Sequence, residues 1–522
     1  MRDRLEIFGG IDIGTTGCRV SFFRRDGTPM ASAHAEYPLE VPRVGWAEQD
    51  PALIFQTLRR VFSEALAALA VPATSIRALT FSSVLHSIFP VEARGEPMHR
   101  MLTFADTRAQ SVLAELSDSL DTDALYRRTG CPLHPMYPLA KILWFRREQP
   151  ELFQAAAKFV SIKEYILYQL TGEWIVDASL ASGSGLFDNR RLDWDTEALA
   201  AIGITHDRLS TIWPTTHVVA RWKNDVFGMP ADIPLVLGAG DGMLSTLGAG
   251  AVGKSQYTAM IGTSGAVRLC VDAPLTDPKS RNWCYNLCDD RWVVGGAINN
   301  GGLAFRWARD KFAANEQHVA EKLNLDTHEV LSRYAEQKPA GSDGLVFLPF
   351  LTGERSPHWN ANARGVLFGL NLNHGKRHLM RATLEGILYS MYSVFRSLRD
   401  LSGNDSEIEI RASGSFSRSD VWVQMMADVF GHRIVLPGPP EGSAFGAAAL
   451  GMIATGRLAG PLEVRNLVGA PRSIAEPNSA HHERYQKLYR IYERVYRNLL
   501  DEFDEIARLQ REFAEQRDAE KG

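Results

Sequence analysis

The 522-residue sequence has few cysteines, little net charge and no long apolar segment. No apolar run approaches the roughly 20 residues that a helix needs to cross a bilayer, and no signal-like apolar core precedes Gly9-Gly10. A formal net charge of −4 gives no electrostatic reason to expect nucleic acid as a partner. The five cysteines are odd in number, and no second cluster completes a zinc pattern. These absences predict a cytoplasmic protein that binds neither membranes nor nucleic acid.

What remains is the composition of an ordinary globular protein, with 45% hydrophobic and 23% charged residues. The length exceeds the usual limit for a single hydrophobic core, so we expect two or three domains. In such a chain Cys284 and Cys288 are most simply small buried hydrophobic residues, with a metal or redox role as the alternative.

Two short segments about half a chain apart share one pattern. Residues 13–17 (I-G-T-T-G) and 261–265 (I-G-T-S-G) each follow an apolar run and precede alternating residues. Each segment predicts a strand, a tight turn and a second strand. Such turns gather backbone N–H groups and hydroxyls in a small concavity that suits phosphate oxygens. Two copies therefore predict two related domains that face one polyphosphate, with hydroxyl donors on Thr15, Thr16, Thr263 and Ser264.

The rest of the pattern alternates between strands and helices. Residues 6–36 predict three strands, and residues 233–237 predict a buried strand that ends at Gly238 before a helix. The second turn unit starts near Ser255, which predicts a domain boundary near residue 250. Further helices are expected over residues 50–70, 300–312, 378–401, 420–430 and 446–453. From about residue 480 an apolar and aromatic stripe predicts a helix that packs on its own body or, alternatively, on a partner copy.

One motif is misleading. Residues 248–255 match the P-loop pattern G-x-x-x-x-G-K-[ST] letter by letter. A P-loop needs a strand before it and a helix after it, because the helix N-terminus must face the phosphates. Here a helix-like run precedes the segment and a strand pattern follows it. We therefore interpret residues 248–255 as a glycine-rich interdomain turn.

Asp12 directly precedes the first turn, and the second copy has Met260 in that place. A carboxylate beside a phosphate is repelled unless a divalent cation lies between them, so Asp12 predicts a magnesium site. The alternative is a turn-initiating aspartate that caps local N–H groups. Arg19 is either a charge partner of the phosphates or an exposed strand arginine.

Asp241 lies between two glycines, after a predicted buried strand and at the start of a predicted helix. Phosphoryl transfer to an alcohol needs a carboxylate within hydrogen-bond reach of the attacking hydroxyl, which makes Asp241 a candidate general base. On these residues alone, a plain helix N-cap is an equal alternative. The small-residue turn 412–415 (A-S-G-S) would allow a ring or a ribose to approach closely, although many ordinary turns have this composition.

Two longer segments resemble the signatures of the FGGY carbohydrate kinases, which belong to the actin-like ATPase superfamily. They are residues 136–148 (M-Y-P-L-A-K-I-L-W-F-R-R-E) and residues 365–385, where G-V-L-F-G-L and H-L-M-R-A-T-L-E are separated by seven residues. With the two turns and Gly-Asp241-Gly, the resemblance covers residues 6–455. It implies an α/β fold of two actin-like (ribonuclease H-like) ATPase domains around an ATP cleft, followed by a helical tail.

The resemblance also implies the domain bounds and the roles of single residues. The N-terminal domain (1–251) would bind the sugar and hold the first turn and the base, the C-terminal domain (252–456) would bind nucleotide, and the tail would span 457–522. Asp241 would be the catalytic base, and Asp12 would lie at Mg²⁺. The nucleotide would be bound by Thr15, Thr16, Gly17, Arg19, Gly262, Thr263, Gly302, Gly414 and Ser415. Arg306 and Ser419 stand where related kinases can carry amides, which leaves those two contacts open.

Within the family, segments such as 81–87 and 103–108 are similar to the branch that acts on gluconate. This similarity implies an acceptor site that contains Leu85, His86, Asp106, Arg108, Lys163 and Asp241. A sugar-acid carboxylate needs cationic or donor-rich surroundings, which His86, Arg108 and Lys163 would supply while Asp106 binds hydroxyls. The alternatives are a satisfied core histidine, an arginine exposed at a helix start and a lysine on a helix surface.

The expected reaction is therefore ATP-dependent phosphorylation of a sugar acid, D-gluconate to 6-phospho-D-gluconate, with Mg²⁺ as cofactor. A kinase of xylulose, or of another ketose or polyol, is the alternative within the family. A non-catalytic actin-like ATP-binding protein is a remote alternative, because both sugar-kinase signatures and the Gly-Asp241-Gly segment are intact. A homodimer is compatible with the sequence.

Overall fold

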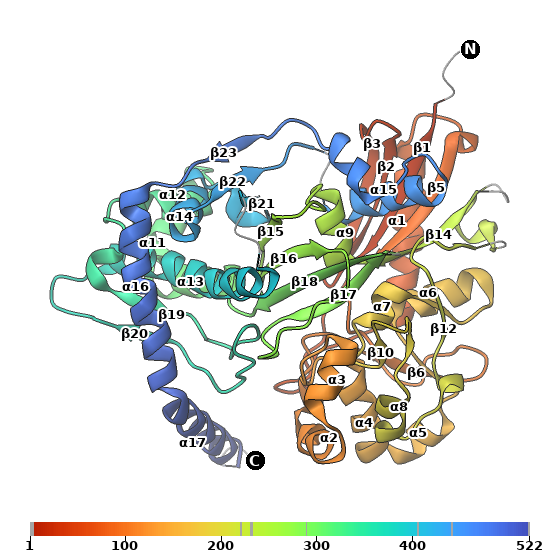
Figure 1. Ribbon diagram of the computed structural model, residues 1–522, viewed down its shortest axis with the longest axis horizontal. Helices are drawn as coiled ribbons and strands as arrows, with labels where there is room; N and C mark the ends of the chain where they lie inside the picture. Colours follow the sequence, from red (N-terminus) through yellow and green to blue (C-terminus); the bar gives the residue numbers. More distant parts are fainter. Residues whose placement is uncertain are drawn as a thin grey trace. The chain divides into compact units, whose positions relative to one another are not determined.

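The computed structural model describes residues 5–219, 222–229, 233–288, 290–403, 407–439 and 442–519. The chain forms two compact units (Figure 1). The first comprises Met1–Lys254, Cys270–Val294 and Gly438–Ala470, and the second comprises Ser255–Leu269, Gly295–Pro437 and Pro471–Gly522. None of the described helices combines the length and the hydropathy that a bilayer crossing requires.

The first unit is built on a sheet with the strand order β13-β14-β5-β1-β2-β3. β1 pairs antiparallel with β2, which confirms the first predicted hairpin, and pairs parallel with β5. β14 lies on the other side of β5 and is also parallel to it. These strands are β1 (Ile7–Ile13), β2 (Gly17–Arg24), β3 (Pro29–Glu36), β5 (Ile76–Ser83), β13 (Val218–Val219) and β14 (Leu235–Gly240).

β14 extends further than the sequence pattern predicts. The predicted strand ends at Gly238, but the ladder to β5 resumes beyond an irregularity and includes Ala239 and Gly240. Gly238 has a φ of +75°, which glycine adopts without steric cost, so the strand continues past it. Asp241 therefore follows the last strand residue directly and is the first residue of α9 (Asp241–Gly248).

Two helices from distant parts of the sequence pack on this sheet (Figure 1). α1 (Pro51–Ala68) begins after Asp50, whose carboxylate accepts the N–H groups of Ala52 and Leu53. Its buried face joins the core of the sheet through Ile54, Leu58, Val61, Phe62 and Ala65. α15 (Ser443–Ala454), blue in Figure 1, lies against the red strands β1 and β5. The return of α15 to this sheet brings its first residue beside Asp12.

The remaining elements of the first unit surround its sheet. The strands are β4 (Glu48–Gln49), β6 (Phe89–Val91), β7 (Met101–Leu102), β8 (Lys158–Val160), β9 (Ile175–Asp177), β10 (Phe187–Asp188), β11 (Asp193–Trp194) and β12 (Thr211–Trp213). β17 (Trp283–Cys288) is instead the first strand of a second, seven-stranded sheet. The helices are α2 (Leu113–Ser119), α3 (Thr122–Thr129), α4 (Pro138–Glu148), α5 (Pro150–Ala155), α6 (Ile162–Thr171), α7 (Ala178–Ser182) and α8 (Thr196–Ile202). All five cysteines are buried, which confirms the expectation for Cys284 and Cys288.

The second unit contains the other strand-turn-strand segment. β15 (Gln256–Ile261) pairs antiparallel with β16 (Gly265–Val271), which confirms the second predicted hairpin. β15 also pairs parallel with β21 (Glu409–Ser413), and the order continues through β22 (Arg433–Leu436) to β23 (Ser473–Ala475). β18 (Arg291–Ile298) runs from residues of the first unit into the second.

Residues 248–255, which match the P-loop pattern, form an interdomain turn as predicted. Helix α9 precedes residues 248–255 and strand β15 follows them, which is the reverse of the order that a P-loop requires. The side chain of Lys254 is exposed and lies 4.0 Å from an Asp272 carboxylate oxygen. The segment is a turn.

The helices of the second unit are α10 (Gly302–Phe312), α11 (Ala314–Lys322), α12 (Thr327–Glu336), α13 (Lys376–Ser402), α14 (Asp420–Phe430), α16 (Ser479–Asn498) and α17 (Leu500–Ala519), with strands β19 (Val346–Leu348) and β20 (Val366–Phe368). α10, α13, α14 and α16 begin close to the predicted positions, whereas α11 and α12 are not in the prediction and the expected tail helix is divided into α16 and α17. α14 has local start and stop signals, because the Ser419 hydroxyl caps its first turn and Gly431 follows with a φ of +70°.

The aromatic stripe of the tail is buried on α13, which confirms that α16 packs on its own body. The hydroxyls of Tyr489 and Tyr492 bond those of Ser393 and Ser390 at 2.9 and 2.8 Å. The Tyr485 hydroxyl donates to the Glu385 carboxylate at 3.0 Å and accepts from the Arg381 guanidinium at 2.9 Å. Arg381 and Glu385 form an ion pair of 2.7 Å with side chains only 7% and 2% exposed.

We expect Glu385→Ala to lower the free energy of unfolding by about 3–5 kcal/mol, because it leaves the Arg381 guanidinium buried without its carboxylate. Urea-induced unfolding measures the loss. Glu505→Ala is the control, since its side chain on α17 is 69% exposed. Its change should stay within about 0.5 kcal/mol. Equal losses for the two variants would contradict the importance of the buried pair.

Candidate active site

The first predicted phosphate turn is bonded internally through its carbonyl oxygens. The Gly17 carbonyl accepts the N–H of Gly14 at 2.9 Å. The Tyr37 hydroxyl donates to the Gly14 carbonyl at 2.5 Å, and the Gln49 amide donates to the Thr15 carbonyl at 2.8 Å. With these acceptors bonded inside the protein, an anion at the turn meets chiefly N–H and hydroxyl donors.

A depression of about 320 Å³ opens at this turn. Its lining includes Asp12, Thr16, Gly17, Arg19 and Ser443. Arg19 is exposed and lies opposite Asp12 in the β1–β2 ladder. The depression is within the size range of small-molecule sites and carries charges of both signs.

Asp12 is bonded by hydroxyls from two other elements rather than by amides of its own turn. The Ser82 hydroxyl of β5 donates to one carboxylate oxygen at 2.6 Å, and the Ser443 hydroxyl of α15 donates to the other at 2.8 Å. Burial raises the pKa of the Asp12 carboxyl above its usual value, and the two hydroxyls and Arg19 oppose that rise. A cation in the depression would favour the ionised form further. The described residues contain no group of three or more metal-binding side chains, so an ion here would need other ligands.

Three predicted site segments follow neighbouring parallel strands. Asp12 stands near the carboxyl end of β1, Leu85 and His86 follow β5, and Asp241 follows β14. The carboxyl ends of parallel strands meet at one edge of a sheet, which is where open α/β sheets bind ligands. The strand order therefore gathers these residues at one edge of the first unit.

Asp241 is the first residue of α9 rather than its N-cap, which is Gly240, so the N-cap alternative is wrong. Its carboxylate is half-buried and accepts the N–H of Gly242 at 2.6 Å. The positive end of the helix dipole favours an ionised carboxylate in this first turn. An ionised, partly accessible carboxylate is what a general base requires.

The short helix α7 connects the Asp241 and His86 segments. The Ser179 hydroxyl oxygen accepts the N–H of Gly240 at 3.2 Å, and the Gly183 carbonyl bonds His86 Nδ1 at 2.7 Å. A carbonyl only accepts, so His86 Nδ1 carries a proton in this bond. Leu85 also packs against the residue that precedes Asp241. A Cβ added to Gly240 would lie 2.8 Å from Leu85 Cδ2.

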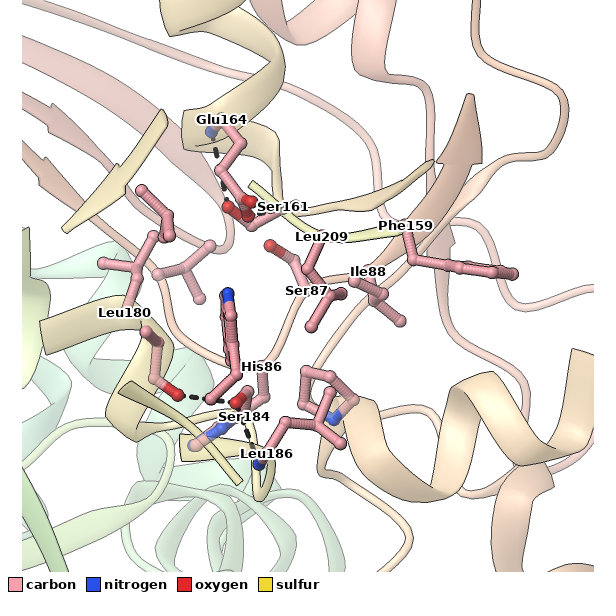
Figure 2. A pocket seen from close by; sticks show the side chains of 15 residues that line it. His86, Ser87, Ile88, Phe159, Ser161, Glu164, Leu180, Ser184, Leu186 and Leu209 are labelled. Carbon is pink, nitrogen blue, oxygen red and sulfur yellow. Dashed lines mark hydrogen bonds between the residues drawn. The ribbon is translucent and has the colours of Figure 1, made fainter. Parts of the chain in front are cut away.

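The His86 ring stands at the edge of a small cavity. Figure 2 shows it among the side chains of Ser87, Leu180 and Ser184. The cavity measures about 30 Å³, which is enough for a water molecule and far too small for a sugar. The ring is half-buried and contacts Tyr137 and Tyr285 edge to face, so His86 is packed but is not a wholly enclosed core residue.

Asp106 and Arg108 form a buried ion cluster with Glu48. The Arg108 guanidinium bonds both Asp106 oxygens and lies 2.6 Å from a Glu48 oxygen. The guanidinium also lies over the Trp46 ring at 3.6 Å. The exposed alternative for Arg108 is wrong, because its side chain is only 1% exposed. Its charge is balanced by two carboxylates, although Arg108 Nη1 is buried without a hydrogen-bond partner in the described residues.

Lys163 is likewise engaged inside the protein. Its ammonium lies 2.7 Å from an Asp177 oxygen, and both side chains have no exposed area, so the surface alternative is wrong. Asp177 caps α7 by accepting the N–H of Leu180 at 2.9 Å. Lys163 is therefore linked to Asp241 and His86 through α7, and its own charge is balanced by a carboxylate.

In the second unit the predicted nucleotide residues lie together. The N–H of Gly302 donates to the Gly262 carbonyl at 2.7 Å, and the carbonyl of exposed Thr263 accepts the N–H of Leu303 at 3.0 Å. Gly414 has a φ of +105°, and a Cβ there would lie 2.3 Å from the Ile261 carbonyl oxygen. Ser415 donates to the same oxygen at 3.5 Å. These contacts join the turn to the starts of two later segments, a close approach that glycine makes sterically feasible.

Several residues that shape the site are absent from the sequence prediction. Ser82 and Ser443 bond Asp12, and Ser179 bonds Gly240. Each is an ordinary serine within a strand or helix, and its partner is far away in sequence. Only the tertiary fold brings such pairs together. Ser419, one of the two open nucleotide positions, uses its hydroxyl to cap α14.

The fold is that of a carbohydrate kinase, an enzyme class that transfers a phosphoryl group to an alcohol. Residues 7–248 match the N-terminal domain, and residues 258–455 the C-terminal domain, of the FGGY family of carbohydrate kinases. The chain belongs to this family. It is thus a phosphotransferase that acts on a small carbohydrate with ATP.

Individual relatives span nearly the whole chain. The gluconokinase of Bacillus subtilis (strain 168) is 40% identical over 96% of this chain and 98% of its own length. Two crystal structures from Lactobacillus acidophilus, a gluconate kinase and a ligand-bound xylulose kinase, each have a TM-score of 0.89 at 32% identity. Both comparisons cover 96% of this chain and 100% of the other. The fold is therefore common to kinases with either name.

We expect Lys163→Met to lower the free energy of unfolding by about 3–5 kcal/mol, because Asp177 is then buried without its counter-charge. Urea-induced unfolding measures the change. The matched double variant Lys163→Met/Asp177→Asn removes both charges but keeps an acceptor for the Leu180 N–H, and it should recover most of the loss. A single variant of normal stability with a raised KM for an anionic acceptor would instead indicate direct contact between Lys163 and the substrate.

Proposed function

We propose that this kinase phosphorylates D-gluconate at its primary hydroxyl to give 6-phospho-D-gluconate, with ATP as donor. The observation that carries the proposal is the 40% identity to a gluconokinase over nearly the full length of both chains. The fold does not discriminate between acceptors, because structures named for gluconate and for xylulose match equally well. Sequence similarity to the gluconokinase is therefore the main support.

In this proposal Asp241 is the general base. It accepts the proton of the acceptor hydroxyl as the oxygen attacks the γ-phosphorus and the bond from γ-phosphorus to the bridging oxygen breaks. Support comes from its half-buried carboxylate at the start of α9, where the helix dipole favours the ionised form. Leu85 lies against Gly240, which precedes Asp241, and His86 lies near Gly183 at the end of α7; both would contact the acceptor.

Asp12 is the proposed residue at Mg²⁺. Magnesium is commonly held by one or two carboxylates together with substrate phosphates, which agrees with the half-buried Asp12 carboxylate that lines the depression. When bound, the ion would neutralise charge on the phosphates. Thr15, Thr16, Gly17 and Arg19 would bind phosphate oxygens beside it.

The nucleotide would also bind to the second unit, through Gly262, Thr263, Gly302, Gly414 and Ser415. The contacts among these residues support this role, because they hold the turn, the start of α10 and the segment after β21 close together and leave Thr263 exposed. The proposed domains are 1–251 for the acceptor, the first turn and the base, 252–456 for the nucleotide, and 457–522 for the tail.

Asp106 and Arg108 would contact the acceptor, but not as the free charges that the sequence predicts. Both charges are already paired, so the carboxylate of gluconate gains little from Arg108 as a free cation. The donor that remains is Arg108 Nη1, buried without a partner among the described residues. We infer that Asp106 and Arg108 act as a rigid polar wall and that Lys163 contributes only through α7.

Xylulose is the second candidate acceptor, because a structure named xylulose kinase shares the fold at a TM-score of 0.89. We place the enzyme in the cytoplasm, because its cysteines are few and buried. Any homodimer would use a surface other than the aromatic stripe of α16, which is buried on α13.

An acceptor screen tests the proposed substrate. Release of ADP, coupled to NADH oxidation, is measured with gluconate, xylulose, ribulose, glycerol and erythritol at equal concentrations. We expect kcat/KM for gluconate to exceed that for each neutral acceptor by at least about 100-fold, since about 2.7 kcal/mol of differential transition-state binding suffices. Turnover of xylulose alone would overturn the assignment.

Asp241→Asn tests the proposed base. The amide has nearly the same shape but cannot accept the hydroxyl proton, so we expect kcat to fall by about 10²- to 10⁴-fold. The Kd for ATP, measured by calorimetry, should change by less than about threefold because the base does not bind the nucleotide. Near-normal turnover would remove Asp241 from this role.

A further inference from the structure

Lys141 is a buried cation that the reaction proposed above does not use. It lies in the second turn of α4, and its side chain has no exposed area. Its ammonium donates to two backbone carbonyls, His86 O at 2.8 Å and Thr103 O at 2.6 Å. Burying an ammonium costs several kcal/mol, whereas an apolar side chain of similar length would avoid that cost. What lysine offers at this position, and methionine does not, is these two hydrogen bonds.

The first of these carbonyls belongs to a strained residue. His86 has a φ of +67°, a left-handed conformation that is unfavourable for residues other than glycine. Such conformations persist where surrounding contacts determine them, and they are common at active sites. Lys141 bonds the carbonyl of His86, and α7 bonds its ring through Gly183. Backbone and side chain of His86 are thus held from two directions.

The second carbonyl belongs to the turn that carries Asp106. Thr103 O accepts the N–H of Asp106 at 3.1 Å as well as the ammonium. The Thr103 hydroxyl donates to Ala47 O at 3.0 Å, and the Ala47 N–H donates back to Asp106 at 2.7 Å. A single ammonium therefore joins the segment after β5 to the turn that holds the Asp106–Arg108 cluster.

We propose that Lys141 is a positioning residue that sets the distance between the His86 and Asp106 segments, and with it the geometry of the acceptor site. The proposal rests on the proposed function, because these two segments are taken to bind the acceptor. Lys141 itself touches neither substrate.

The bridge does not depend on the charge of Lys141. Burial lowers the pKa of Lys141 to about 7, with Asp106 opposing and Arg108 reinforcing the shift. A neutral amine still has two N–H groups, enough for both carbonyls. Loss of the donors by substitution, rather than a change in pH, is therefore the perturbation that tests the bridge.

Lys141→Met removes both donors and keeps the length of the side chain. We expect KM for gluconate to rise by about tenfold or more, because about 1.4 kcal/mol lost in acceptor binding is a factor of ten. The KM for ATP should change by less than about twofold, since the nucleotide does not contact these segments. Steady-state kinetics with each substrate varied in turn measures both constants.

Lys158→Met is the matched control. Lys158 also donates to two backbone carbonyls, Asp207 O at 2.7 Å and Leu209 O at 2.8 Å, but neither belongs to a segment proposed to bind the acceptor. Its loss should lower the unfolding temperature while leaving both KM values within about twofold of the parent. This comparison separates positioning of the acceptor from a general contribution to stability.

An unchanged KM for gluconate in folded Lys141→Met would overturn the proposal, as would equal rises in both KM values. If the methionine variant does not fold, Lys141→Gln, which retains an amide donor, is used, and a raised acceptor KM with a normal ATP KM is again required. Should the parent phosphorylate xylulose instead of gluconate, the substrate assignment fails. The same measurements with xylulose then decide the role of Lys141 independently.

Discussion

Parallel pairing of β5 with β1 and β14 is the constraint on which the site of the first unit depends. It brings the carboxyl ends of three strands to one edge, so Asp12, His86 and Asp241 lie along that edge although more than two hundred residues separate the first from the last. Small residues make the approach close, as Gly240 against Leu85 illustrates. A shift of one residue in β5 would turn its side chains to the opposite face and separate these groups.

Charges near this edge are mostly engaged within the protein. Arg108 is paired with Asp106 and Glu48, and Lys163 with Asp177. Pairs buried in this way hold segments in place and present few free charges to a ligand. Lys141 serves the same purpose with carbonyl partners. In the proposed site the acceptor would therefore contact a polar surface of already paired groups, where orientation of hydrogen-bond donors and acceptors contributes more than net attraction.

The same strand-turn-strand segment has different neighbours in the two units. In the first unit, Asp12 precedes the turn and is held by Ser82 and Ser443. In the second, Met260 takes that place, and the starts of α10 and of the segment after β21 close on the turn instead. In the proposed function the first copy would thus combine phosphate-binding donors with a carboxylate for a cation, and the second would supply donors for the nucleotide.

Local sequence was sufficient for the hairpins around residues 13–17 and 261–265, for most helices of the second unit, and for Asp241 as a candidate base, because turn residues and periodicity act over a few positions. The extent of β14 was not predictable, since its pairing with β5 overrides the break at Gly238. The environments of Arg108 and Lys163 were also not predictable, because their partners Glu48 and Asp177 come close to them only after folding. Sequence by itself thus determined which residues have the right chemistry and where the chain turns. Tertiary structure alone decided which of those residues meet, because strand order and helix packing join positions that carry no local sign of one another.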